Sequence, residues 1–239
     1  MIDGLTFILN GVVVLHCCLR TFKPVLWRAR FEVKQTLQEI EYNIEARKET
    51  DKIMWFSMWA VLSVASFGIA WFPMIYYMIK RRNDHFSRQE QLEELILSKL
   101  RKNKSTEKLG LAFSKAKNQE LSRNAKAWTL STLLIVPAFY VFYFLKSDLQ
   151  KHEEHEHDFL DEIIALAKDS GIPLNIQSYA TTSCFPLDKY LVLSVVTFGL
   201  AAAYWLYRIF NDYNNHFKMQ WLIEDDLLRF LKGLDKKSS

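Results

Sequence analysis

The chain has 239 residues, a formal net charge of +4 and a hydrophobic content of 50%. The apolar residues gather in long uncharged runs, which argues against an ordinary globular domain with evenly spread apolar positions. Only three cysteines occur, and the sequence contains no GxxxxGK[ST], GxGxxG, HExxH or CxxC motif, which argues against a disulfide framework, a nucleotide-binding loop and a zinc-protease site.

The first apolar run covers residues 5–19 and is interrupted by polar residues. Asp3 replaces the usual basic start of a signal peptide, and no small-residue cleavage site follows before Arg20, so we expect no cleaved leader. Two interpretations stay open, a short transmembrane span and a helix lying in the membrane interface. Residues 31–51 follow as a predicted amphipathic helix, suited to a helical partner or to its own chain.

Three longer runs lack any charged residue: 53–79, 127–145 and 190–207. About 20 apolar residues in a helix cross a bilayer core of roughly 30 Å, so each run is long enough to span. Tryptophan and tyrosine cluster near the ends of the runs, as they do at membrane interfaces. The sequence therefore predicts an all-α, polytopic integral membrane protein with three transmembrane helices, the third ending near residue 210, a possible short fourth at the N-terminus, and amphipathic helices on both sides.

The loops predict an orientation. Residues 80–126 hold 13 Lys and Arg against 6 Asp and Glu, whereas residues 146–189 hold 4 against 9. Since basic loops remain in the cytoplasm, residues 80–126 and the C-terminus are predicted to be cytoplasmic and residues 146–189 to lie outside. The expected partner of the basic surface is the lipid bilayer, with its anionic headgroups, rather than nucleic acid.

An internal repeat organises the chain. Residues 61–93 and 192–224 align without a gap at an offset of 131, with 13 of 33 positions identical. We therefore predict a first repeat at 1–100, a basic linker at 101–126 and a second repeat at 127–239. Each repeated span is followed by a predicted cytoplasmic amphipathic helix, at 84–100 and 214–232.

Two sets of residues recur in both copies. Small residues in the spans predict close helix packing: Ser63, Ser66, Gly68, Ser194, Thr197 and Gly199. Polar and aromatic residues after the spans predict a capped turn: Asn83, His85, Phe86, Asn214, His216 and Phe217. A paired metal site at the two histidines would need a third ligand from elsewhere in the chain.

The run KHEEHEHD, residues 151–158, carries the other candidate ligands. His152, His155 and His157 with the acidic residues between them predict a site for a divalent transition metal, and no other cofactor is expected. The alternative interpretation is the solvated start of a helix. That helix is predicted to end at Gly171, ahead of Pro173.

The pattern of Ser66-Phe67-Gly68 and Thr197-Phe198-Gly199, with an aromatic-rich helix end and an Arg/Asn-Asp turn, resembles a family of uncharacterised small prokaryotic membrane domains with a Gly-Ile-Tyr type span, here present twice. The resemblance covers about 35 residues per copy. It implies a location in a prokaryotic plasma membrane and no particular activity.

No catalytic constellation accompanies these features, so we expect no enzyme. The favoured function is a structural or accessory subunit that packs with other membrane subunits or with copies of itself. Two alternatives are a homo-oligomeric channel or transporter lined by serine and threonine, and an outer-face metal-binding protein that uses the histidine-rich run.

Overall fold

The computed structural model describes residues 35–100, 107–174, 176 and 187–238. Within these ranges every regular element is a helix, which confirms the all-α prediction. Residues 35–45 are helical, and the elements after them are α2 (Arg47–Thr50), α3 (Phe56–Ala65), α4 (Trp71–Leu100), α5 (Glu107–Gln119), α6 (Ala125–Ser131), α7 (Ile135–Ser170), α8 (Leu187–Val196) and α9 (Leu200–Ser238). The predicted N-terminal run 5–19 lies outside the described residues.

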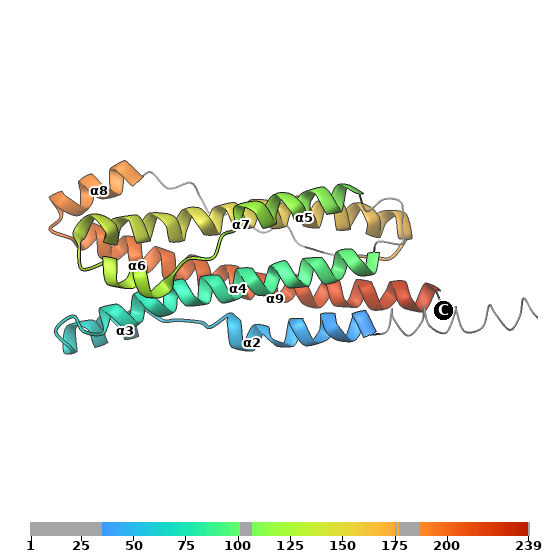
Figure 1. The fold of residues 1–239 in the computed structure, drawn as a ribbon, viewed down its shortest axis with the longest axis horizontal. Coiled ribbons are helices and arrows are strands. Elements are labelled where there is room, and N and C mark those ends of the chain that lie inside the picture. The colour runs from blue at the N-terminus through green and yellow to red at the C-terminus, as the bar shows by residue number, and fades with distance from the viewer. Residues whose placement is uncertain (1–34, 101–106, 175, 177–186, 239) are drawn as a thin grey trace, which may run out of the picture.

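Three hairpins build the fold, and each consists of a short helix, a tight turn and a long helix: α3–α4, α6–α7 and α8–α9. The long helices α4, α7 and α9 run together along the molecule, and the three turns gather at one end (Figure 1). We call that end the hairpin end. The hairpins α3–α4 and α8–α9 contain the two copies of the sequence repeat. The hairpin α6–α7 has the same shape but a different sequence.

The predicted transmembrane helices are wrong. No helix of the described residues combines the length and the apolar character that crossing a membrane requires. Each apolar run instead folds back on itself, because a turn divides it at residues 66–70, 132–134 or 197–199. The polytopic architecture and the multi-pass location in a plasma membrane are therefore not supported.

Backbone conformation explains two of these turns. Phe67 and Gly68 have φ of 52° and 89°, and Phe198 and Gly199 have 50° and 91°. Two successive residues in the left-handed region cannot continue a right-handed helix, so the chain reverses. The repeated Phe-Gly pair is thus a helix terminator, which a reading of hydropathy alone treats as part of a span.

The predicted orientation is also wrong. The basic segment that begins at residue 80 and the acidic segment that begins at residue 146 were expected on opposite sides of a membrane, yet both lie in the same half of the bundle. Salt bridges join them: Arg82 and Arg123 contact Asp148, and Lys115 contacts Asp158. The basic and the acidic segment therefore pair with each other across one interface.

Two hydrophobic cores hold the bundle. One lies next to the hairpin end and contains large buried residues such as Ile75, Phe144 and Trp205. The other lies toward the far end and contains Ile96, Ile163 and Phe230. Between them the long helices bury charged and polar side chains, and this polar layer holds the candidate site.

Candidate metal centre

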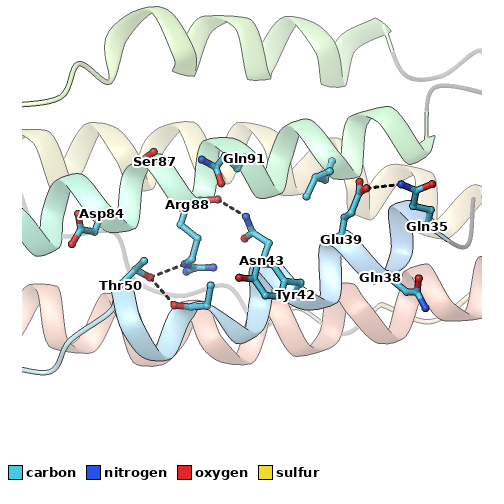
Figure 2. Close-up of a pocket in the computed structure, with 12 residues that line it drawn as sticks. Gln35, Gln38, Glu39, Tyr42, Asn43, Thr50, Asp84, Ser87, Arg88 and Gln91 are labelled. Atoms are coloured by element: carbon cyan, nitrogen blue, oxygen red, sulfur yellow. Dashed lines mark hydrogen bonds between the residues drawn. The ribbon is translucent and has the colours of Figure 1, made fainter. Parts of the chain in front are cut away.

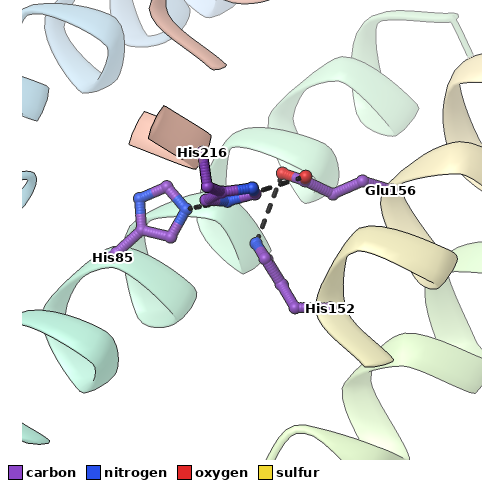
Figure 3. A group of neighbouring side chains, drawn as sticks. All are labelled: His85, His152, Glu156 and His216. Carbon is purple, nitrogen blue, oxygen red and sulfur yellow. Dashed lines mark hydrogen bonds and ion pairs between the residues drawn. The ribbon is translucent and has the colours of Figure 1, made fainter. Parts of the chain in front are cut away.

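Four side chains converge inside the polar layer: His85, His152, Glu156 and His216 (Figure 3). His85 comes from α4, His152 and Glu156 from α7, and His216 from α9. All four are at most 4% exposed. On α7 the spacing of four residues places His152 and Glu156 on one helical face, so three helices suffice to supply four ligands.

The ligand atoms lie close enough for a single ion. One nitrogen from each histidine and one oxygen of Glu156 all fall within 4.8 Å of one another. The Nε2 atoms of His85 and His216 are 3.1 Å apart, and Nε2 of His152 is 3.3 Å from Oε1 of Glu156. Two nitrogens bound to tetrahedral zinc at about 2.0–2.1 Å are themselves separated by about 3.3 Å.

Each histidine has a carboxylate at its other ring nitrogen. Nδ1 of His85 is hydrogen-bonded to Oδ1 of Asp51 and Nδ1 of His152 to Glu120, both at 2.9 Å. Nδ1 of His216 lies 3.4 Å from Oε1 of Glu153, without the geometry of a hydrogen bond. In metal sites such partners fix the orientation and tautomer of the imidazole and make its Nε2 a better ligand. Here such partners orient the imidazoles of His85 and His152.

Aromatic rings close the site. The ring of Phe86 stacks on His152 with centroids 4.0 Å apart, and Phe217 lies 4.6 Å from His85. These are equivalent residues of the two repeats. Together they shield the imidazoles from water, which strengthens every electrostatic interaction at the centre.

The buried charges act on one another. Burial lowers the pKa of His85 to about 4, although the charge of Asp51 opposes it. Burial also disfavours a charge on His152, but Glu120 and Glu156 outweigh it and raise the pKa of this histidine well above its ordinary value. Burial opposes ionisation of Glu156, while the charges of His152 and His216 lower its pKa to about 2. The centre thus pairs an ionised Glu156 with a His152 that binds a proton readily.

Asp51 connects the centre to its surroundings. Its Oδ2 accepts hydrogen bonds of 2.8 Å from Nη2 of Arg88 and 2.9 Å from Nε1 of Trp221. Arg88 in turn contacts the buried Glu224 at 2.7 Å. The orientation of His85 is therefore tied to α9 through a chain of charged groups.

The two repeated asparagines bind backbone groups of other segments and do not form the predicted capped turn. No turn forms at these positions because α4 and α9 continue through them. The amide of Asn83 donates to the carbonyl of Arg123 at 2.6 Å and accepts from its N–H at 3.1 Å. The amide of Asn214 binds the carbonyl and N–H of Met54 at 2.7 and 3.2 Å. Each asparagine fixes the segment that leads into another hairpin.

The predicted ligands divide into two groups. Of the three histidines of the run 151–158 only His152 reaches the centre, where Glu156 of the same run joins it. His155 contacts Glu120 at 3.0 Å, and His157 is not part of the group. The two repeat histidines supply the further nitrogens, and Glu156 supplies the carboxylate. The sequence showed both halves of the site, but nothing in the spacing connected a loop predicted to be outside with turns predicted to be inside.

The predicted packing residues lie at or near the hairpin turns. Ser63 and Gly199 line one apolar cavity of about 280 Å³ between two hairpins. Ser194 donates to the carbonyl of Tyr190 at 2.6 Å, while Ser66 and Thr197 accept from backbone N–H groups in their turns. A Cβ at Gly68 or Gly199 would meet nothing within 4 Å, so inside this chain both glycines serve the turn conformation. A role in packing with other chains stays a prediction.

A large groove lies away from the histidines. A groove of about 660 Å³ runs between helical residues 35–45 and α4, lined by polar side chains such as Gln35, Glu39 and Gln91 (Figure 2). Beside the centre, a cavity of about 10 Å³ touches His152 and Glu120. That volume holds about one water molecule. This cavity is too small for a substrate.

Comparisons with protein-family models, with curated proteins and with solved structures found no match.

Proposed function

We propose that this chain is a non-catalytic protein that binds one divalent transition-metal ion through His85, His152, His216 and Glu156. The observation that carries the proposal is the convergence of three imidazole Nε2 atoms and one carboxylate oxygen within 4.8 Å, with a carboxylate at each opposite Nδ1. Nitrogen ligands with one oxygen suit zinc, and also copper, iron or nickel.

A structural role for the ion fits the geometry better than catalysis. Structural zinc sites fill all four positions with protein ligands, whereas catalytic sites leave one position for water or substrate. Here four ligand side chains are available, all are buried, and the adjoining cavity holds about one water. The ion would cross-link α4, α7 and α9 midway between the two cores. Such a rigid bundle suits the accessory role expected from the sequence.

The competing interpretation is a buried network of ion pairs in which protonated His152 neutralises Glu156. Against it, the ion pair between Nε2 of His152 and Oε1 of Glu156 is 3.3 Å long and lacks the geometry of a hydrogen bond. Buried polar atoms normally have a partner. A metal ion satisfies this nitrogen together with the two that face each other.

The experiment that tests the proposal measures bound metal and its ligands. The full chain, stripped with a chelator and dialysed against Zn²⁺ or Co²⁺, should retain one ion per chain by elemental analysis. Cobalt should give the visible absorption of tetrahedral coordination. His216→Ala should lose the ion, whereas His157→Ala, on the same helix as two of the ligands but outside the group, should retain it.

The variant Glu156→Cys provides a second test, in which a new absorption band should appear. A thiolate at this position should create a sulfur-to-cobalt charge-transfer band in the near ultraviolet that the unaltered protein lacks. Retention of cobalt by a folded His216→Ala variant, or the absence of stoichiometric metal from the unaltered protein, would show that the group is only a polar network.

A further inference from the structure

The hairpin end exposes large apolar side chains. Phe67 and Phe198, at equivalent positions of the two repeats, are 98% and 99% exposed. Further exposed apolar residues lie in or beside the three turns, among them Ile69, Ile135, Val136 and Leu200. The three turns lie at the same end of the bundle (Figure 1), so these side chains form one apolar surface. Apolar surfaces of this kind mark interaction sites.

The polar groups of the turns are satisfied internally. Each backbone N–H from Ser66 to Trp71 and from Thr197 to Ala201 donates a hydrogen bond within its own hairpin. The hydroxyls of Thr132 and Thr197 donate to carbonyls three and four residues earlier, at 2.7 and 2.6 Å. Water makes such internal pairing unnecessary, whereas hydrocarbon requires it.

Side-chain types change in layers away from the turns. Below the apolar residues come exposed tyrosines, among them Tyr77 on α4, Tyr143 on α7 and Tyr207 on α9. Basic residues follow within a few positions on two of these helices, at Lys80 and Arg208. Lys146 on α7 is instead buried and paired with Asp212. Aromatic residues followed by Lys and Arg are the order found where a protein meets lipid headgroups. A second protein surface would not require this order.

The depth of the apolar layer matches half a bilayer. Lys80 lies nine positions after Trp71, and Arg208 lies eight positions after Leu200. At about 1.5 Å per residue these segments are about 12–14 Å long. The hydrocarbon core is about 30 Å thick, so a single leaflet provides about 15 Å.

We propose that the hairpin end inserts into one leaflet of a lipid bilayer with an anionic surface, to the level of its tyrosines and basic residues. The chain enters the leaflet and returns three times, so no helix crosses. The apolar side chains of Phe67 and Phe198 would lie in hydrocarbon, and the positive charges would meet the phosphates of the headgroups. The proposal is independent of the metal centre, which lies on the far side of one hydrophobic core.

Vesicle flotation tests the proposal. The full chain should float with vesicles of phosphatidylcholine and phosphatidylglycerol, and the bound fraction should fall with added salt because headgroup attraction is screened. The double variant Phe67→Asp, Phe198→Asp should lose at least tenfold in partitioning. Aspartate tolerates a positive φ better than phenylalanine does, and both positions are nearly fully exposed, so the fold should survive.

A matched control carries the same charges elsewhere. Leu111→Asp, Leu222→Asp alters two exposed apolar side chains, on α5 and on the far part of α9, and should float like the unaltered protein. Equal flotation of the turn variant and the control would overturn the proposal. A dimer in solution that dissociates in the turn variant, with no binding to vesicles, would overturn it in favour of a second copy as the partner of this surface.

Discussion

His85 and His216 face each other with Nε2 atoms 3.1 Å apart, and the 131 positions between them equal the offset of the internal repeat. Equivalent residues of the two copies therefore meet at the centre of the molecule. The same holds for the residues beside them, since Phe86 and Phe217 each cover an imidazole. α7 contributes the remaining two ligands, so the third hairpin completes a site that the repeat alone leaves half built.

The carboxylates behind the histidines should control the affinity for metal. Glu120→Gln keeps the shape of the side chain but removes the charge that faces Nδ1 of His152. Loss of such a partner typically lowers metal affinity about 10–100-fold. Competition with a chromophoric chelator measures the change. Glu154 is an exposed acid on the same helix as His152, and Glu154→Gln serves as the control. This variant should leave the metal affinity within error of that of the unaltered protein.

Metal should stabilise the folded chain. An ion that binds only the folded state, present at about 1,000 times its dissociation constant, raises the free energy of unfolding by about 4 kcal/mol. Urea denaturation with and without Zn²⁺ measures this difference. His216→Ala should lose the metal-dependent part and His157→Ala should keep it. A metal-dependent gain that persists in folded His216→Ala would place the ion elsewhere.

The turn glycines should resist substitution for a conformational reason. Gly199 has φ of 91°, and a Cβ there would meet no atom within 4 Å. Gly199→Ala should therefore destabilise the chain on the order of 1–2 kcal/mol through backbone strain alone. Gly110 also has open space but lies within α5 without a positive φ. Gly110→Ala should instead stabilise by about 0.5–1 kcal/mol. Thermal unfolding distinguishes the two, and effects of the same sign would refute the explanation.

Glu224 should make stability depend on pH. Burial raises the pKa of this carboxyl from 4.5 to about 7, against the opposing charges of Arg88 and Arg47. A carboxyl group with a higher pKa in the folded chain binds more protons when folded, so stability should decrease as pH rises from about 4.5 to 7. The loss is on the order of 3 kcal/mol at most, at about 1.4 kcal/mol per pH unit.

Denaturation of Glu224→Gln across this interval, with chelator present, checks the pH effect. The variant should lose the decrease, because its amide does not titrate. Asp225→Asn removes a half-exposed neighbour that contacts the same Arg47, and it should keep the slope of the unaltered protein. An identical slope in Glu224→Gln would assign the pH dependence to other groups.

Sequence patterns predicted local features better than their arrangement. Helical periodicity and the end of α7 at Gly171 are confirmed, since the glycine takes a left-handed φ of 67°. The runs 53–79 and 190–207 were misjudged because mean hydropathy is insensitive to the backbone reversal at Phe67-Gly68 and Phe198-Gly199. Their apolar residues do share one environment, at the end of a bundle rather than along a span.

The metal group was predicted only in part, for a related reason. His85 and His216 were recognised as equivalent, and His152 as a candidate ligand, but charge balance assigned the two sets to opposite sides of a membrane. Attraction between the basic and acidic segments, seen in the contact of Arg82 with Asp148, brings them together instead. Net charge does not distinguish segments kept apart by a membrane from segments that pair.

The contact between Asn214 and Met54 has a consequence for synthesis on the ribosome. The segment leading into the α3–α4 hairpin is held by an amide 160 positions later in the chain. The last of the three histidine nitrogens arrives at nearly the same time, on His216. A growing chain can thus form its early hairpins, but it can fix them to one another only when the last helix emerges. In chains that terminate before residue 214, the first hairpin would lack its contact with Asn214 and the metal group would lack His216. Quality-control proteases can recognise such an incompletely packed state.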